Sequence, residues 1–377
     1  MRKYASLITL LVVLSLVIAA CGGDDGVSDT QAGTVAPGGT DELVVCEVDQ
    51  TDGDLNFYNW TEYIDPELIS AFEEEYGVDI VEDFFDSNEA MLAKLQSGAV
   101  YDLIVPSDYM VGIMVEEDVI AELQRDAIPN LTNLDGFFAD PAYDPGGVHS
   151  AAYQWGTTGL GVNMDVVGED FEASWALAFD PDLISQYPGG VSLLNDPRET
   201  MGAALKYLGY SLNSTSEAEL QEAADLIATA KQYVTQFESD LYDESLVADE
   251  VAVSHGYSGN FFTAIEDVDG WDTYTYVIPE EGGTVWIDNM AVPVSAEHPC
   301  TAHTFINYLL DAENGAALTN WNFYASPNAA AEAFILPEIL EDETIYPSDD
   351  LSARLEIITD TGDFEIQYTD FFAIAKS

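Results

Sequence analysis

Three short strand patterns alternate with two helical patterns between residues 55 and 106, and this alternation limits the possible folds more than any other feature of the chain. Asp65-Pro66-Glu67 marks a helix start, because it supplies an N-cap, a proline at the first helical position and an acid in the first turn. Gly77 marks the end of that helix, and Ser87 caps a second helix that stops by Gly98. The β-α-β-α-β order predicts an α/β fold with a largely parallel, doubly wound sheet. Its strands are expected at 55–58, 78–85 and 101–106.

Aromatic and acidic side chains recur directly after the strand patterns. Because the carboxyl ends of strands in a doubly wound sheet converge on one crevice, we expect these side chains to meet there. Ring faces attract ammonium groups and pack on alkyl chains, and carboxylates accept hydrogen bonds from ammonium protons. The set therefore predicts a site for a slender organic cation. Its members are Trp60, Glu62, Tyr63, Ser107, Tyr109, Asp196, Glu199, Tyr257, Trp286 and Asp288.

The remainder of the chain continues the mixed pattern without an internal repeat. Two extended segments, 151–161 and 290–294, are suited to crossing between two lobes. A helical stretch that contains Pro181 is expected within 163–191. Further strands are expected at 192–194, 251–257 and 274–278, and helices at 200–212, 214–237, 301–310 and 311–318.

Residues 1–20 have the pattern of a secretory signal peptide. Met1-Arg2-Lys3 is basic, and the apolar run that follows is too short for a comfortable membrane span. Ile18-Ala19-Ala20-Cys21 resembles a bacterial lipobox, which implies cleavage before Cys21 and lipidation of that cysteine. Residues 21–53 then form the lipidated cysteine and a flexible spacer, so we expect a lipoprotein anchored to a membrane outside the cytoplasm. The alternative is an ordinary secretory signal with an incidental cysteine.

Two cysteines remain in the mature chain, Cys46 and Cys300. An even number in an oxidising compartment makes a disulfide plausible, whereas two buried free thiols are the alternative. Their spacing does not decide between the two.

The charge of the chain is extreme. Removal of Arg2 and Lys3 leaves seven Lys and Arg against seventy Asp and Glu, a net charge of −63. Nucleic acids and anionic lipid headgroups are poor partners for such a surface, whereas a cationic ligand is steered toward it. One site does not need so many carboxylates, so most of them are interpreted as an adaptation of the surface to salt or to solubility.

Several stretches, in this order, resemble the bacterial periplasmic spermidine/putrescine-binding proteins, the receptors of polyamine ABC importers. The resemblance covers roughly residues 55–377 and is much more specific than a lone motif. The matching stretches are Phe57-Tyr58-Asn59-Trp60-Thr61-Glu62-Tyr63, Ser87-Asn88-Glu89, Ala93-Lys94-Leu95, Tyr101-Asp102-Leu103-Ile104-Val105-Pro106-Ser107, Trp155-Gly156, Gly161-Val162-Asn163, Arg198-Glu199, Lys206-Tyr207-Leu208-Gly209-Tyr210, Trp286-Ile287-Asp288 and Ser326-Pro327-Asn328.

The resemblance implies a periplasmic binding protein of type II-like fold, with two doubly wound lobes joined by two hinge crossings that close on the ligand. Its lobe boundaries would be 54–157 with 289–325, and 158–288 with 326–377. It also implies a monomer with neither cofactor nor metal, which takes part in transport rather than catalysis. Its partners would be the polyamine, the membrane subunits of an ABC importer and, through the lipid, the membrane.

The resemblance further assigns roles to individual residues. A polar and aromatic wall falls on Trp60, Thr61, Glu62 and Tyr63, with Ser107 and Tyr109 beside it. The amine-binding carboxylates fall on Asp196, Glu199 and Asp288, and the rings that stack on the alkyl chain fall on Trp286 and Tyr324.

Two departures from the family pattern affect the choice of ligand. Tyr257 stands where the family has tryptophan, which keeps an aromatic face but makes it smaller. The side-chain amide that spermidine binders use near the C-terminus has no clear match, although Glu356 and Gln367 lie in that region. The matches at Glu62 and Tyr109 favour spermidine over putrescine, and the departures leave room for another amine.

Three alternatives remain open at this point. A secreted hydrolase has little support, because the four histidines lack metal-site spacing and no nucleophile elbow or phosphate loop occurs. Residues 267–272 alternate acids but lack the terminal glutamate of a calcium-binding EF-hand loop. A receptor of the same fold for an amino acid would need an arginine to hold the carboxylate, and Arg198 is the one basic candidate near the predicted site.

Overall fold

A computed structural model describes residues 44–362 and 364–377 of the protein. The predicted signal peptide, Cys21 and the spacer as far as residue 43 lie outside the described residues. Within the described part, no helix is long and apolar enough to cross a membrane.

The predicted β-α-β-α-β unit opens the fold. Strand β1 (Leu55–Trp60) lies between β2 (Ile80–Phe85) and β3 (Leu103–Ile104) and pairs with both in parallel. The helices that follow these strands are α1 (Pro66–Tyr76), α2 (Asn88–Gln96) and α3 (Asp108–Glu116).

The caps of the first two helices form as the sequence predicts. The Asp65 carboxylate accepts a hydrogen bond from the Glu67 N–H, and Gly77 ends α1 in the left-handed conformation, at φ 69°. The Ser87 hydroxyl accepts from the Ala90 N–H at the start of α2. These local contacts explain why both helices begin at the predicted positions.

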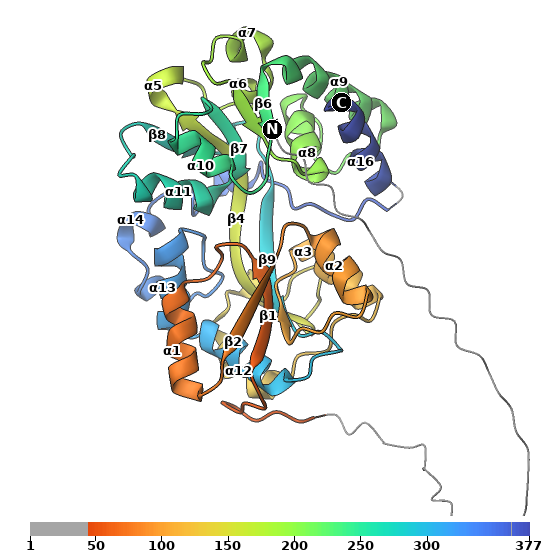
Figure 1. Ribbon diagram of the computed structural model, residues 1–377, viewed down its shortest axis with the longest axis vertical. Helices are drawn as coiled ribbons and strands as arrows, with labels where there is room; N and C mark the ends of the chain where they lie inside the picture. The colour runs from red at the N-terminus through yellow and green to blue at the C-terminus, as the bar shows by residue number, and fades with distance from the viewer. Residues whose placement is uncertain (1–43, 363) are drawn as a thin grey trace, which may run out of the picture. The chain divides into compact units, whose positions relative to one another are not determined.

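Two long strands run between the two groups of elements in Figure 1, β4 (Ser150–Asn163) and β9 (Val285–Ala291). The first half of β4 pairs antiparallel with β9, and its second half pairs antiparallel with β7 (Val253–Tyr257) and β8 (Tyr274–Val277). Strand β9 also pairs antiparallel with β3. The predicted crossing at 151–161 is therefore part of a single long strand that pairs with strands of both groups.

The second group of strands is completed by β5 (Val191–Leu193), which pairs in parallel with β7 and with β6 (Val234–Phe237). The strand order is β2-β1-β3-β9-β4-β7-β5-β6, with β8 beside β4. Parallel pairs thus flank an antiparallel centre, so the largely parallel sheet that the opening pattern predicts holds only for the flanks.

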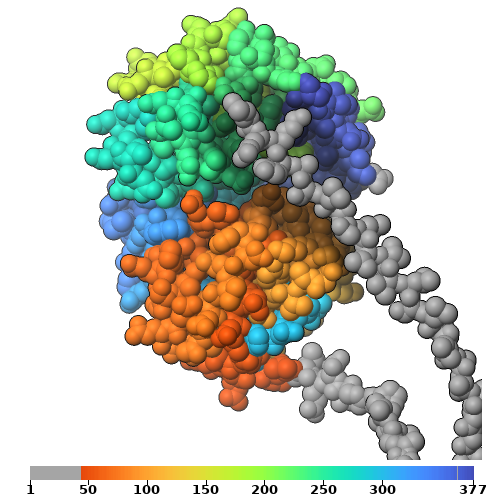
Figure 2. Space-filling view, viewed as in Figure 1, coloured from red at the N-terminus to blue at the C-terminus, as the bar shows by residue number. Residues whose placement is uncertain are grey.

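Helices surround both groups of strands (Figure 1). One core packs around Phe57, Phe72 and Phe305, and another packs around Trp175 and Phe179. In Figure 2 the orange surface of the first elements lies below the green surface of the other group. The remaining helices are α4 (Gly136–Ala139), α5 (Met164–Val167), α6 (Ala176–Phe179), α7 (Pro181–Ile184), α8 (Pro197–Tyr207), α9 (Glu217–Ala230), α10 (Tyr242–Val247), α11 (Ser258–Asp267), α12 (Pro299–Leu309), α13 (Ala312–Asn322), α14 (Pro337–Leu340), α15 (Asp349–Ser352) and α16 (Phe364–Ala375), with short 3-10 turns at Arg125–Ala127, Pro129–Asn133, Lys231–Tyr233 and Ala331–Ala333.

Several predicted boundaries are wrong. The helix predicted at 214–237 ends at Ala230, and its last four residues form β6 instead. The strand predicted at 101–106 is only two residues long, and the helical stretch within 163–191 is divided into α5, α6 and α7. In the region of the crossing predicted at 290–294, β9 begins at Val285 and ends at Ala291.

Cys46 and Cys300 form a disulfide between the first described residues and the first turn of α12. Both residues are buried. The bridge joins positions that are 254 residues apart in sequence, so it ties the beginning of the folded chain to a late helix.

Candidate functional site

One cavity of about 640 Å³ brings together residues from both groups of strands. All twelve positions that the sequence analysis predicts as ligand-binding line it. They are Trp60, Thr61, Glu62, Tyr63, Ser107, Tyr109, Asp196, Glu199, Tyr257, Trp286, Asp288 and Tyr324.

Aromatic rings form one wall of the cavity. The Trp286 ring lies edge-on to two others, with its centroid 5.1 Å from that of Tyr324 and 6.0 Å from that of Tyr257. The Tyr63 ring meets Tyr324 at 5.2 Å in the same way. Trp60 is held by a 3.0 Å hydrogen bond from its indole N–H to the Val105 carbonyl oxygen. The rings are therefore fixed by one another and by the backbone before any ligand arrives.

A glycine sets the position of the Trp286 ring. Gly156 on β4 is directly opposite Trp286 on β9. A methyl group at Gly156 would lie 2.7 Å from Cζ2 of Trp286 and 3.0 Å from the Ser258 hydroxyl oxygen. The indole thus occupies space that only glycine leaves free at this position.

Asp288 lies on β9 and is 5% exposed. Its Oδ1 accepts a 2.7 Å hydrogen bond from the Ser107 hydroxyl, and no basic side chain of the described residues pairs with it. Burial raises the pKa of the Asp288 carboxyl to about 7, although hydrogen bonding by the hydroxyls of Ser107 and, to a smaller extent, Tyr63 opposes the shift. Near neutral pH this carboxyl is therefore close to its titration midpoint in the absence of a ligand.

Glu199 and Asp196 reach the cavity from the start of α8. Asp196 is the N-cap of the helix, and its carboxylate accepts hydrogen bonds from the backbone N–H groups of Arg198 and Glu199. The Glu199 carboxylate accepts from the hydroxyls of Thr158 (3.1 Å) and Thr284 (2.8 Å). Burial, followed by the nearby Asp196 charge, raises the pKa of Glu199 to about 8. No basic side chain of the described residues forms an ion pair with either acid, so both are available to a cation.

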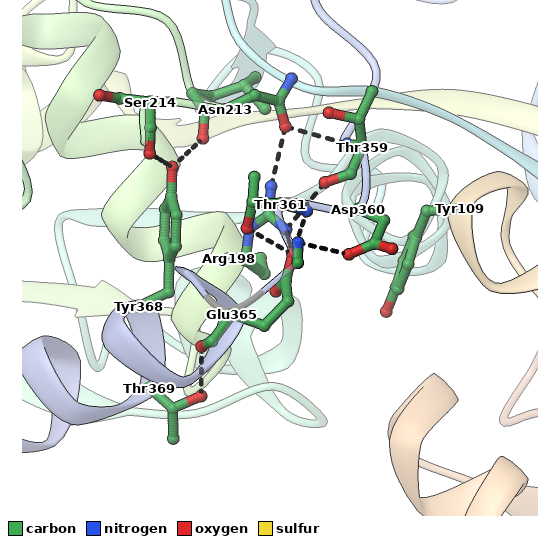
Figure 3. Close-up of polar contacts among 12 residues, drawn as sticks. Tyr109, Arg198, Asn213, Ser214, Thr359, Asp360, Thr361, Glu365, Tyr368 and Thr369 are labelled. Atoms are coloured by element: carbon green, nitrogen blue, oxygen red, sulfur yellow. Dashed lines mark hydrogen bonds and ion pairs between the residues drawn. The ribbon is translucent and has the colours of Figure 1, made fainter. Parts of the chain in front are cut away.

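Arg198 is the one basic residue among the residues that line the cavity, and its guanidinium is already engaged (Figure 3). Its Nη1 donates to the Glu365 carboxylate and to the Thr359 carbonyl oxygen, and its Nη2 donates to Asn213 Oδ1 at 2.8 Å. The guanidinium carbon also lies 4.5 Å from the ring centroid of Tyr368. Arg198 therefore holds the C-terminal segment in place, and these contacts argue against its serving as a clamp for a ligand carboxylate.

Other residues that line the cavity were not predicted from the sequence. Two of them, Asn88 and Asp108, are almost completely buried and lie beside predicted positions. Neither Glu356 nor Gln367, the residues near the unmatched C-terminal amide, lines the cavity; Ile358 does so instead. Glu356 pairs with Lys206 at 2.8 Å, outside the cavity lining. The other missed lining residues are Phe84, Phe85, Asp86, Ser87, Ser239, Asp240, Leu241, Tyr242, Glu244 and Asn260.

The chemistry of this lining suits a cation with an apolar chain. Carboxylates accept hydrogen bonds from ammonium groups, and ring faces pack on methylene groups and attract positive charge. Within the described residues, no group of three or more His, Cys, Asp or Glu side chains has a geometry that could hold a metal ion.

Comparison with known proteins places the chain in a family. The family model described as bacterial extracellular solute-binding protein matches residues 67–347. The chain belongs to this family. Among curated relatives of this solute-binding protein, a putrescine/cadaverine-binding protein of Pseudomonas aeruginosa is 35% identical over 313 residues, which cover 81% of this chain and 88% of the relative. The spermidine/putrescine-binding periplasmic protein of Escherichia coli is 33% identical over 325 residues, which cover 86% of this chain and 91% of the relative.

A solved structure from Listeria monocytogenes, described as a candidate spermidine/putrescine ABC transporter protein, matches this solute-binding protein with a TM-score of 0.79. The two are 36% identical, and the match covers 86% of this chain and 99% of the other. The predicted resemblance to the polyamine-binding proteins is therefore confirmed, as is the fold of the periplasmic binding protein type II-like class.

Proposed function

We propose that this protein is the extracytoplasmic receptor of a polyamine ABC importer and binds spermidine or putrescine in the cavity between its two lobes. The observation that carries the proposal is a ring-lined cavity with buried carboxylates whose one basic side chain, Arg198, is already paired with Glu365. Such a lining is unfavourable without a ligand, because several buried carboxylates lie close together with hydrogen-bond donors but without a cation to balance their charge. A chain with an ammonium group at each end supplies the missing partners.

In this proposal, different residues contact different parts of the polyamine. Asp288 and Glu199 accept hydrogen bonds from ammonium groups, and Asp196 adds negative charge beside Glu199. The rings of Trp286, Tyr257 and Tyr324 pack on the methylene groups between the charges. Each ring contributes roughly 0.5–2 kcal/mol, depending on how completely water is excluded. The protein binds its ligand and releases it unchanged, without catalysis.

The two lobes of the proposed receptor are 54–157 with 289–325 and 158–288 with 326–377. Closure of the lobes around the polyamine would bring both walls of the cavity onto the ligand, as in other hinged binding proteins. Lipidation at Cys21 would anchor the protein at the outer face of a membrane, and it would act as a monomer that delivers its ligand to the importer's membrane subunits. Mass spectrometry of the mature N-terminus tests the anchor, because a free unmodified residue at its start would contradict it.

Isothermal titration calorimetry with spermidine, putrescine and a panel of amino acids tests the ligand class. The proposal expects saturable 1:1 heat with a polyamine and none with amino acids. Heat with an amino acid alone would reject it. The Asp288→Asn variant should lose at least ~2 kcal/mol of binding free energy, about 30-fold in affinity, because an ammonium group loses its buried charged partner. Asp272→Asn, on an exposed turn outside the cavity lining, is the matched control and should bind like the unaltered protein.

A further inference from the structure

Asn88 forms the start of a short hydrogen-bond chain that ends on Asp288. Asn88 is the first residue of α2 and is 5% exposed. Its Oδ1 accepts from the Ser107 backbone N–H at 3.0 Å, and its Nδ2 donates to the Ser107 hydroxyl oxygen at 3.0 Å. The Ser107 hydroxyl in turn donates to Asp288 Oδ1 at 2.7 Å. Ser107 and Asp288 also form an antiparallel bridge, so the backbone holds the last two members in register.

The direction of this chain is fixed by its first contact. A backbone N–H can only donate, so the Asn88 amide must turn its oxygen toward the Ser107 N–H. That orientation places the Asn88 NH₂ group against the Ser107 hydroxyl oxygen. Because this oxygen already receives a proton, its own hydrogen must point elsewhere, and Asp288 is the acceptor within reach. Ser107 is therefore a committed donor to Asp288.

We propose that Asn88 is a positioning residue that acts through Ser107 to hold Asp288 in its charged form and in one orientation for a bound ammonium group. This inference rests on the proposed function for the nature of the ligand, but the hydrogen-bond chain exists without it. One Asp288 oxygen is occupied by Ser107, which leaves the other oxygen for the ligand. Asn88 itself need not touch the ligand to affect its binding.

Few other groups compete with Ser107 for control of Asp288. The titratable groups that face it are Asp108 on α3, Tyr63 in the loop before α1, Tyr143, Tyr153 on β4 and Tyr324 after α13. None of them is a cation, and Asp108 is an acid whose carboxylate is engaged with the N–H groups of Tyr109 and Ile287. The Ser107 hydroxyl makes the larger hydrogen-bond contribution that favours the charged form of Asp288 against the effect of burial, and the Tyr63 hydroxyl makes a smaller one.

The inference predicts that Asn88→Ala raises the titration midpoint of Asp288 in the ligand-free protein. The midpoint is measured by NMR of carbon-13-labelled aspartate, with the Asp288 signal assigned from the Asp288→Asn variant. We expect an upward shift of at least about half a pH unit, because Ser107 is then free to turn away from the carboxylate. In the Ser107→Ala background, Asn88→Ala should cause no further shift, since Asn88 acts only through that hydroxyl.

A purely structural role for Asn88 would give a different result. It would lower the melting temperature without moving the Asp288 midpoint, or it would shift the midpoint equally with and without Ser107. Either result overturns the inference. The matched control is Asn163→Ala, since Asn163 is equally buried and donates to the Asp249 carboxylate outside the cavity lining. It should leave the Asp288 midpoint unchanged. If Asn88→Ala does not fold, Asn88→Asp keeps the acceptor for the Ser107 N–H, removes the donor and should also raise the midpoint.

Polyamine titration of the same variants separates this inference from the proposed function. If the unaltered protein binds no polyamine, the proposed function fails while the NMR test still decides the role of Asn88. If the unaltered protein binds and the Asn88→Ala midpoint is unchanged, only the inference fails. When both hold, the polyamine affinity of Asn88→Ala should fall by at least about 3-fold near pH 6 and by less near pH 8, where Asp288 is mostly ionised in either protein.

Discussion

Polyamine affinity should rise steeply with pH between about pH 6 and pH 8, because two carboxyls of the cavity titrate in this range when the ligand is absent. Burial raises the pKa of Asp288 to about 7 and that of Glu199 to about 8. Aliphatic amines with a pKa near that of lysine, about 10.4, stay protonated throughout. Bound ammonium groups favour the ionised carboxylates, so the ligand must displace protons from the empty site.

The size of the effect follows from these two values. A carboxyl that must be ionised in the complex weakens the apparent affinity about tenfold for each pH unit below its pKa. Between about pH 8 and pH 6, the expected loss is roughly 10-fold from Asp288 and roughly 50-fold from Glu199. If both must ionise, the combined loss is roughly 500-fold, or ~3.7 kcal/mol.

Calorimetry in buffers with different ionisation enthalpies measures the protons directly. Near pH 7 we expect the release of between about one and two protons per polyamine bound. Glu199→Gln should remove the larger part of the release, whereas Glu217→Gln, on the exposed start of α9, should not change it. An affinity that is flat from about pH 6 to pH 8, with no buffer dependence of the heat, would refute the reasoning.

The same titrations predict how the stability of the ligand-free protein varies with pH. Because the folded state binds protons at Glu199 and Asp288 more tightly than the unfolded chain does, their contribution to stability is present in acid and is lost as pH rises through about 7 to 8. Saturating polyamine should abolish this trend, because both carboxyls are then ionised in the folded complex as they are in the unfolded chain. Thermal melts with and without ligand test the sign.

Three further changes have expected outcomes. Gly156→Ala should lower polyamine affinity at least about 10-fold, because the added methyl group displaces the Trp286 ring. Titration calorimetry measures the change, and an unchanged affinity would mean that the ring has room to move. Reduction of the Cys46–Cys300 disulfide should lower the unfolding free energy measured in urea by about 2–5 kcal/mol. Neither cysteine lines the cavity, so polyamine affinity should stay within about twofold, and a large loss of affinity would contradict this expectation. His255→Leu should increase the unfolding free energy, measured in urea, by about 1–2 kcal/mol, because the imidazole is fully buried and neither ring nitrogen has a hydrogen-bond partner among the described residues. A loss of stability would show that the packing of the imidazole contributes more than its missing hydrogen bonds cost.

The elements that could be predicted from the sequence are those whose ends depend on local chemistry. Asp65 and Gly77 mark the two ends of α1 through contacts within a few residues, so the local sequence is enough to predict both ends. Strand β6 is different. Val234 continues a helical composition from α9, and it becomes a strand because it pairs with Val191 on β5, which is 43 residues away in sequence. No local pattern records that pairing.

Some lining residues were missed because β6 was predicted as the end of a helix. Residues Ser239, Asp240 and Leu241 line the cavity directly after β6, where a strand-end rule would have placed them had the strand been recognised. Asn88 and Asp108 were overlooked for another reason. Each is the first residue of a helix, at a position where a short polar side chain is ordinarily read as part of the helix start. Their contacts with Ser107 and Ile287 depend on strands that meet only in the folded protein.

Nine of the twelve predicted positions lie at or shortly after the carboxyl end of a strand, where the convergence of strand ends brings them together whatever the individual residue. Trp286 and Asp288 instead lie within β9, and Tyr324, which only the family resemblance indicated, follows α13. The antiparallel pairing of β4 with β9, β7 and β8 was not foreseen, yet it leaves Tyr257 and Trp286 at the same cavity, on the two strands that lie on either side of β4. The position of the site was thus insensitive to the orientation of the central strands.

A crystal structure of the protein grown with spermidine is the most direct test of the central claim. The account predicts an extended chain in the cavity, with ammonium nitrogens within hydrogen-bond distance, about 2.7–3.2 Å, of the Asp288 and Glu199 carboxylates and with methylene groups against the Trp286 ring. Spermidine bound elsewhere, or a cavity that stays empty at a concentration that saturates binding in solution, would contradict it.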